Sequence, residues 1–251
     1  MRAFGRKLRE ARGGAWPQSR AMKAIDWTAA SDELDAHGCA LLPGLLSEAE
    51  CARLIAAWEA RELFRSEVVM ARHGFGRGAY RYFDYPLPDA VATLRAALYP
   101  PLAAIADRWA ERLGADTRYP ADHEAWLARC RAAGQARPTP LMLRYEAGDW
   151  NALHQDVYGE HVFPLQVALL LSEPGADFTG GEFVLAEQRP RQQSRAEVVP
   201  LRRGDGVVFP VRERPARGKG AGWHRRAMRH GVSRVRSGLR FTLGIIFHDA
   251  T

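Results

Sequence analysis

The stretch Leu153-His-Gln-Asp-Val157 places two possible metal ligands close together in the sequence. Alternate residues of an extended strand point to one face, so His154 and Asp156 are expected side by side. A distant histidine, His230, follows, and Arg240 lies ten residues beyond it. Two histidines and one carboxylate form the facial triad that holds non-haem Fe(II) and leaves coordination positions open. The sequence therefore predicts an iron site at His154, Asp156 and His230.

The segment Arg240-Phe-Thr-Leu-Gly-Ile-Ile-Phe247 reads as a strand that is apolar except at its start. Arg240 and Thr242 are expected on one face of it. A charged side chain in such a strand is costly without a partner. A guanidinium can bind a carboxylate through two parallel hydrogen bonds. The segment thus predicts a site for the far carboxylate of a 2-oxoacid.

Short apolar segments separated by Gly, Pro and Asp surround these residues. Strands are expected over 141–145, 153–157, 163–171, 180–185, 197–199 and 206–209, in a stretch ending at 235, and over 240–247. About eight short strands with turn signals between them are typical of an all-β sandwich or barrel.

The first half of the chain has helical patterns instead. Helices are expected over 31–37, from about residue 48, over 89–114 and over 121–133, with a strand and turn over 38–46. Ser47-Glu-Ala-Glu50 is a capping box for the second helix. Pro100 and Pro101 are predicted to break or kink the third. Residues 64–87 are rich in aromatic residues, Gly and Arg, and read as a β-hairpin or a lid.

The C-terminal half resembles the Fe(II)- and 2-oxoglutarate-dependent dioxygenases of the prolyl-4-hydroxylase-like and AlkB-like type. The resemblance lies in five motifs: Tyr145-x-x-Gly148-x5-His154-x-Asp156, Gly180-Gly-Glu182, Gly204-Asp205, His230-Gly-Val232 and Arg240-x-Thr242. Further segments are similar to an uncharacterised bacterial family of such oxygenases, which is assigned to nucleic-acid modification. These segments are 80–88, 138–140, 153–159 and 246–249.

The resemblance implies a mainly β fold with flanking helices, a double-stranded β-helix (jelly roll). It implies that His154, Asp156 and His230 bind Fe(II), and that Arg240, Thr242 and Tyr145 hold the 5-carboxylate of 2-oxoglutarate. With O2 as cosubstrate, a C–H bond is hydroxylated and succinate and CO2 are released. One domain is expected over 21–251, with a mainly helical flank and lid over 21–137 and the jelly-roll core over 138–251, after a basic, flexible N-terminus over 1–20.

The substrate is less determined. AlkB-type enzymes carry a second Arg shortly after the first, whereas no second Arg occurs between Arg240 and Phe247. Oxidative demethylation of nucleic-acid bases, hydroxylation of a prolyl residue and hydroxylation of a small molecule all stay open. So do a non-catalytic metal-binding jelly roll and a nucleic-acid-binding module, although neither of these needs both an open metal site and a 2-oxoacid clamp.

Charge offers a second indication of the partner. The formal net charge is +7, and the chain has only three lysines, at 7, 23 and 219, so that most of its positive charge is arginine. A basic rim near the expected site would attract a polyanion, and an Arg-rich surface with local carboxylate partners is the alternative. The arginines concerned are Arg189, Arg191, Arg195, Arg202, Arg203, Arg212, Arg214, Arg217, Arg225, Arg226 and Arg229.

Other features place the protein in a reducing compartment. Cys39, Cys51 and Cys130 are odd in number and widely spaced, which does not suggest a disulfide framework or a zinc site. The basic start of the chain is not followed by an apolar signal core, and no segment has the roughly 18 apolar residues of a membrane span. A cytoplasmic protein without a membrane partner is expected, and its oligomeric state is unknown.

Several further residues have a functional and a structural interpretation. His224 is a rival for the distal ligand, and His248 could support the site from behind. Gln166 and Asn151 could hydrogen-bond the cosubstrate or be satisfied by the backbone. The aromatic run at 80–85 could stack on a flat substrate or pack as an amphipathic hairpin.

Overall fold

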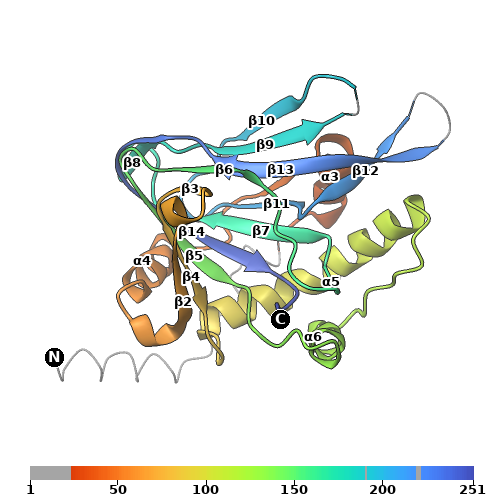
Figure 1. Cartoon of the computed structure of the whole chain (residues 1–251), viewed down its shortest axis with the longest axis horizontal. Helices are drawn as coiled ribbons and strands as arrows, with labels where there is room; N and C mark the ends of the chain where they lie inside the picture. Colours follow the sequence, from red (N-terminus) through yellow and green to blue (C-terminus); the bar gives the residue numbers. More distant parts are fainter. Residues whose placement is uncertain (1–23, 190, 219–221) are drawn as a thin grey trace.

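The structure is a computed structural model, and it describes residues 24–189, 191–218 and 222–251. Two antiparallel sheets lie one above the other, and helices α4, α5 and α6 lie on the side of the larger sheet (Figure 1). The predicted mainly β architecture with flanking helices is confirmed. The expected flexible segment 1–20 lies outside the described residues.

The larger sheet has eight strands in the order β1-β11-β7-β14-β5-β4-β2, with β8 paired to β14. Its central strand β14 is long, and it pairs with β8 at its start and with β5 and β7 further on. The strands are β1 (Ala40–Leu42), β2 (Phe64–Val69), β4 (Ala79–Phe83), β5 (Leu141–Glu146), β7 (Leu165–Leu170), β8 (Phe178–Gly180), β11 (Gly206–Pro210) and β14 (Val235–Ile246).

The smaller sheet has six strands in the order β10-β9-β13-β6-β3, with β12 paired to β13. Its strands are β3 (Gly76–Arg77), β6 (Trp150–His154), β9 (Phe183–Gln188), β10 (Arg195–Val199), β12 (Glu213–Arg217) and β13 (Trp223–Val232). The strand expected over 153–157 is wrong at its C-terminal end. Strand β6 stops at His154, and Asp156 follows in an irregular segment.

Residues 64–87 form a hairpin rather than a separate lid. Strands β2 and β4 pair with each other, and β4 pairs with β5, so the hairpin extends the larger sheet. Tyr82 and Phe83 are buried in it. The division at residue 137 stays a prediction, although strands from before that point take part in both sheets.

The helices begin and end where local capping chemistry places them. Asp26 caps α3 (Trp27–His37), Ser47 and Glu50 form the predicted capping box of α4 (Glu48–Ala57), and Asp122 caps α6 (His123–Ala132). Each cap satisfies backbone N–H groups that the first turn of a helix leaves free. Two short 3-10 helices, Arg61–Leu63 and Met70–Arg72, flank β2.

Helix α5 (Asp89–Arg112) runs through Pro100 and Pro101, so the expected break is wrong. Proline removes backbone hydrogen bonds from the helix. Tertiary packing outweighs that loss, because Leu98, Tyr99 and Leu102 around the prolines are completely buried. Among the described residues, no helix has the combination of length and apolar character that crossing a membrane requires.

Two hydrophobic clusters hold these layers together. One fills the space between α5 and the larger sheet, with Leu98, Tyr99 and Phe247 completely buried. The other lies between the two sheets and includes Tyr145, Phe183, Phe209 and Met228. The second cluster surrounds a hollow, and the polar residues predicted for the functional site point into it.

Candidate metal and cosubstrate site

Strand pairing brings the two predicted histidine ligands together. His154 ends β6, and its partner across the β6–β13 ladder is His230. Asp156 reaches the same point from just beyond β6, because the chain turns away from the sheet after His154. The alternation of side chains along a strand therefore does not explain why His154 and Asp156 lie close together. The two side chains are nevertheless close, as predicted.

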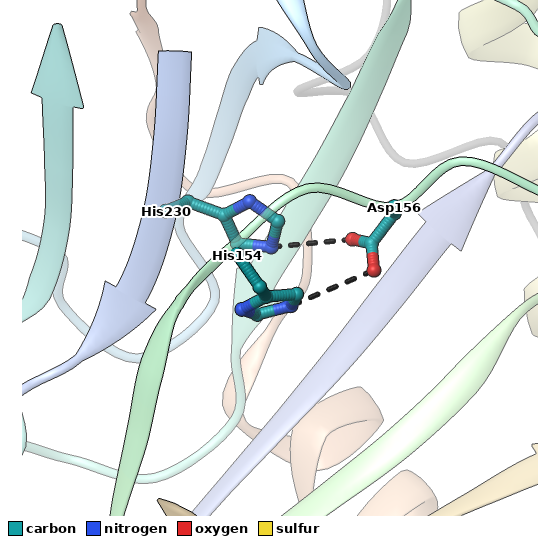
Figure 2. Close-up of side chains that lie close together, drawn as sticks. All are labelled: His154, Asp156 and His230. Carbon is teal, nitrogen blue, oxygen red and sulfur yellow. Dashed lines mark ion pairs between the residues drawn. The ribbon is translucent and has the colours of Figure 1, made fainter. Parts of the chain in front are cut away.

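The three side chains offer ligand atoms that lie within 4.8 Å of one another. The Nε2 atom of His154 lies 3.5 Å from one carboxylate oxygen of Asp156, and the Nε2 atom of His230 lies 3.2 Å from the other. Figure 2 shows both imidazoles turned toward the carboxylate. Two neutral nitrogen donors and one carboxylate on one side of a hollow suit Fe(II) with open positions.

Hydrogen bonds fix the orientation of two of these groups. The Nδ1 atom of His154 lies 2.8 Å from the carbonyl of Ala152, so Nδ1 carries the proton and Nε2 is left as a ligand atom. The hydroxyl of Tyr158 donates to Oδ1 of Asp156 at 2.9 Å, and Tyr82 donates to Tyr158 at 3.0 Å. Support of this kind holds a ligating carboxylate in one rotamer.

The electrostatics couple the three groups. Burial opposes the charge of Asp156, but the neighbouring His230 and His154 outweigh it and hold the pKa of Asp156 well below its usual range. Burial also disfavours the charged form of His154, yet its hydrogen bond and attraction to Asp156 raise the pKa of His154. Burial dominates at His230 and lowers its pKa. The carboxylate is thus ionised when a cation approaches.

Arg240 is buried in the larger sheet, across from Tyr145 in the β14–β5 ladder. Its guanidinium donates to the hydroxyl of Thr242 at 2.5 Å, while its Nε atom is buried without a hydrogen-bond partner. Within the described chain, no carboxylate forms an ion pair with Arg240. Burial lowers the pKa of Arg240 to about 10, so it remains cationic at neutral pH. A buried cation without an ion-pair partner is a favourable place for an anion from outside the chain.

A cavity of about 420 Å³ joins these two features. Its lining includes all three members of the triad and also Arg240, Thr242, Tyr145, Asn151 and Gln166. Gln166 has a buried side-chain N–H without a partner, and Asn151 donates to the hydroxyl of Tyr145 at 3.2 Å. The arrangement can hold a cation at one place and a carboxylate at another in the same enclosed space.

The other residues with a possible functional role differ in whether they line the cavity. His224 lies on the β12–β13 ribbon, outside the cavity lining. The ring of His248 is fully buried, and its Nδ1 accepts from the backbone N–H of Phe163, which is a structural role. Tyr80 and Tyr82 line the cavity, whereas Tyr85 donates to Asp249 elsewhere.

The expected basic rim is only partly free. Several of its arginines form ion pairs with carboxylates, namely Arg189, Arg195, Arg203, Arg212, Arg214 and Arg225. Arg214 is buried against Glu187 and holds α3 through backbone carbonyls. Arg229, on the strand that carries His230, is exposed.

Sequence reasoning missed Tyr158 and Phe75. Tyr158 lies two residues after Asp156, in the segment 153–159 already noted for its resemblance, and could have been found by its position. Phe75 is remote in the sequence and reaches the cavity only through the docking of β3 on β6.

Comparisons with known proteins agree with this geometry. Residues 78–250 match an oxygenase family described as catalysing oxidative methylation of damaged DNA. An uncharacterised protein of Mycobacterium tuberculosis (strain CDC 1551 / Oshkosh) is 52% identical over 174 residues, which are 69% of this chain and 74% of that protein.

Solved structures show the same fold at low identity. A Pseudomonas putida prolyl-4-hydroxylase superposes with a TM-score of 0.53 at 17% identity, covering 90% of this chain and 99% of that one. A 2OG-Fe(II) oxygenase family oxidoreductase from Burkholderia pseudomallei gives 0.53 at 19% identity, covering 91% and 94%. The expected enzyme class, with Fe(II), 2-oxoglutarate and O2, agrees with this family, this fold and the His–Asp–His group. The chain belongs to the matched oxygenase family and has the double-stranded β-helix of 2-oxoglutarate-dependent non-haem iron dioxygenases.

Proposed function

We propose that this protein hydroxylates a C–H bond of a nucleic-acid base, with oxidative demethylation as the outcome when the carbon is an N-methyl group. His154, Asp156 and His230 hold Fe(II), and Arg240, Thr242 and Tyr145 hold the 5-carboxylate of 2-oxoglutarate. The observation that carries the proposal is the buried, unpaired guanidinium of Arg240 in the same cavity as the three metal ligands.

The chemistry of the cavity favours a dicarboxylate that spans it. Arg240 offers an unused Nε–H, and the hydroxyls of Thr242 and Tyr145 are beside it. A 2-oxoacid has a second carboxylate and a keto oxygen that suit the open positions of a facial triad. Burial of the charged pair away from water strengthens the attraction between guanidinium and carboxylate.

Bound Fe(II) would supply O2 activation, with one oxygen atom ending in the hydroxylated product and the other in succinate. The chain's own residues do the positioning. His154 keeps its proton on Nδ1 through the Ala152 carbonyl, and Tyr158 holds Asp156. Phe183 and Phe209 pack near the ring of His230 at 6.1 and 4.7 Å between ring centroids. These rings form an apolar wall beside one of the metal ligands.

The nucleic-acid substrate is supported by the activity on damaged DNA that is described for the family and by the chain's charge of +7. The aromatic side chains of Tyr80 and Tyr82 in the cavity wall suit a flat ring. The prolyl-4-hydroxylase from Pseudomonas putida shares the fold at 17% identity, so a prolyl peptide is the alternative substrate to test.

The first experiment is an anaerobic titration of the metal-free protein with Fe(II) and 2-oxoglutarate, followed by visible absorption. A weak metal-to-ligand charge-transfer band is expected for the wild type and not for His154→Ala. Arg240→Ala should still bind Fe(II) but need at least tenfold more 2-oxoglutarate to produce the band, since a charge-assisted bidentate contact is lost. An equal 2-oxoglutarate requirement in Arg240→Ala would remove the cosubstrate role of Arg240.

The substrate is tested with single-stranded DNA that carries one N-methylated base, and in parallel with a proline-rich peptide. Mass spectrometry should show loss of the methyl group from the DNA, in proportion to the succinate formed. Hydroxylation of the peptide with no change in the DNA would replace the proposed substrate by the alternative.

A further inference from the structure

Exposed apolar side chains gather at the mouth of the catalytic cavity. The large hydrophobic residues most exposed in the described chain are Leu41, Phe75, Tyr85, Trp150, Leu153, Val157 and Val198. Of these, Phe75 and Leu153 line the cavity, and Trp150 lies on the same strand as Leu153. Apolar surface concentrated around an active-site opening indicates contact with a substrate.

Phe75 is held in place by its backbone. The backbone N–H of Phe75 donates to the carbonyl of Met70 at 3.2 Å, and the carbonyl of Phe75 accepts from Ala152 of β6 at 2.9 Å. Met70 is completely buried and anchors the loop. Gly76 must be glycine, with φ at 128° and the carbonyl oxygen of Trp150 only 2.3 Å from where a Cβ would lie. The phenyl ring is therefore presented in a prearranged position although 48% of the residue is exposed.

The ring of Phe75 already takes part in one stack. The imidazole of His73 lies against it, with 5.4 Å between ring centroids and 23° between planes. Phe75 lines the cavity and His73 does not, so His73 supports the phenyl ring on the side away from the site. A flat ring that enters the mouth can continue this stack.

Exposed arginines lie before and after Phe75 in the sequence, and another lies on β13. Arg77 follows Phe75 closely, its side chain is 66% exposed, and it forms a long ion pair with Asp149 at 3.8 Å. Arg72 and Arg229 are exposed and form no ion pair with a carboxylate of the described chain. Because His230 faces the cavity, the neighbouring Arg229 projects to the outer face of the smaller sheet. This outer face carries no helix in Figure 1.

We propose that Phe75 is the stacking platform for a nucleobase of a single-stranded nucleic acid, and that Arg77, two residues further on, contacts a phosphate of the same strand. The inference deepens the proposed function and depends on its nucleic-acid substrate. A strand of nucleotides satisfies both features at once, since every base has a flat apolar face and every linkage carries a negative charge. A neutral peptide would cover the apolar mouth but would offer no anion to the exposed guanidinium of Arg77.

The test is fluorescence anisotropy with a labelled single-stranded DNA, using protein loaded anaerobically with Fe(II) and 2-oxoglutarate. Phe75→Ala should weaken binding by about 5- to 100-fold, because stacking on one aromatic side chain accounts for a change of that order. Phe75→Trp should bind like the wild type, whereas Phe75→Leu should behave like Phe75→Ala. Val198→Ala is the matched control, as it removes an exposed apolar side chain of β10 away from the mouth.

The salt dependence of DNA binding distinguishes the contribution of base stacking from that of phosphate contacts. Arg77→Ala should reduce the slope of log K against log salt by about 0.7, as expected for one lost phosphate contact on a single strand. Phe75→Ala should weaken binding and leave that slope unchanged. Circular dichroism and the unfolding midpoint of each variant show whether it has folded.

The outcomes distinguish this inference from the proposed function. If the wild type demethylates and binds DNA but Phe75→Ala binds it equally well, the platform is overturned and the proposed function stands. If the wild type neither binds nor oxidises DNA and a proline-rich peptide binds in a Phe75-dependent way, both are overturned. Wild-type affinity in Phe75→Leu would also overturn the platform, because an aliphatic side chain would then suffice.

Discussion

At the scale of single residues, proton competition should govern metal binding. Metal ligation by His154 requires the neutral ring. Its pKa is raised, chiefly by Asp156 against the effect of burial, whereas the pKa of His230 is lowered by burial. As the pH falls through the raised pKa of His154, a proton must be expelled before Fe(II) can bind.

We therefore expect the Fe(II) affinity to fall by about tenfold per pH unit on the acid side of the His154 pKa. The sign follows from the direction of the shift, since a raised pKa moves the loss of affinity to higher pH. One proton accounts for this slope, because burial lowers the pKa of His230 and the two histidines lower the pKa of Asp156. Anaerobic competition with a chromophoric chelator between pH 6 and 8 measures the Fe(II) affinity. An affinity that does not change across that range would contradict the prediction.

At the scale of elements, a buried ion pair joins α5 to the end of β14. The guanidinium of Arg95 donates to Asp249 at 2.8 Å, to the carbonyl of Ile246 at 2.8 Å and to the hydroxyl of Tyr85 at 3.0 Å. The side chains of Arg95 and Asp249 are 2% and 0% exposed. Such a network fixes how the helix lies on the sheet that carries Arg240.

Removal of one partner should be costly, because the other charge is then buried and unpaired. Arg95→Ala is expected to lower the free energy of unfolding by about 3–5 kcal/mol. Arg131→Ala is the matched control, since Arg131 pairs with Glu124 on the exposed face of α6 and should cost no more than about 1 kcal/mol. Urea denaturation measures both free energies of unfolding. Equal losses in the two variants would show that the buried pair of Arg95 and Asp249 contributes no more stability than the exposed pair of Arg131 and Glu124.

At the scale of the whole molecule, the candidate site joins the two sheets. His154 and His230 come from the smaller sheet, and Tyr145, Arg240 and Thr242 come from the larger one. The groups lie apart in the unfolded chain, so ligands that bind them stabilise only the folded state.

Fe(II) and 2-oxoglutarate together should therefore raise the unfolding midpoint. At 100 times its Kd, a ligand adds about 2.7 kcal/mol to the free energy of unfolding. In Arg240→Ala the part due to Fe(II) should persist, while the part due to 2-oxoglutarate at wild-type concentrations should be lost. Anaerobic thermal scans test this, and an undiminished 2-oxoglutarate effect in Arg240→Ala would argue against contact between the two sheets through the cosubstrate.

The features that depend on local chemistry could be predicted from the sequence. Alternation of apolar residues predicted most of the strands, and the capping box at Ser47 and Glu50 predicted the start of α4. The types and order of His154, Asp156, His230 and Arg240 indicated the metal and the carboxylate, because few other reaction classes need that combination.

The features that depend on long-range contacts could not be predicted in this way. Burial against the larger sheet kept α5 continuous through Pro100 and Pro101. The turn after His154 placed Asp156 against both imidazoles, and the docking of β3 on β6 brought Phe75 to the cavity mouth. Local propensity contains no information on which distant segment a residue meets, since that choice is made by packing of the whole core.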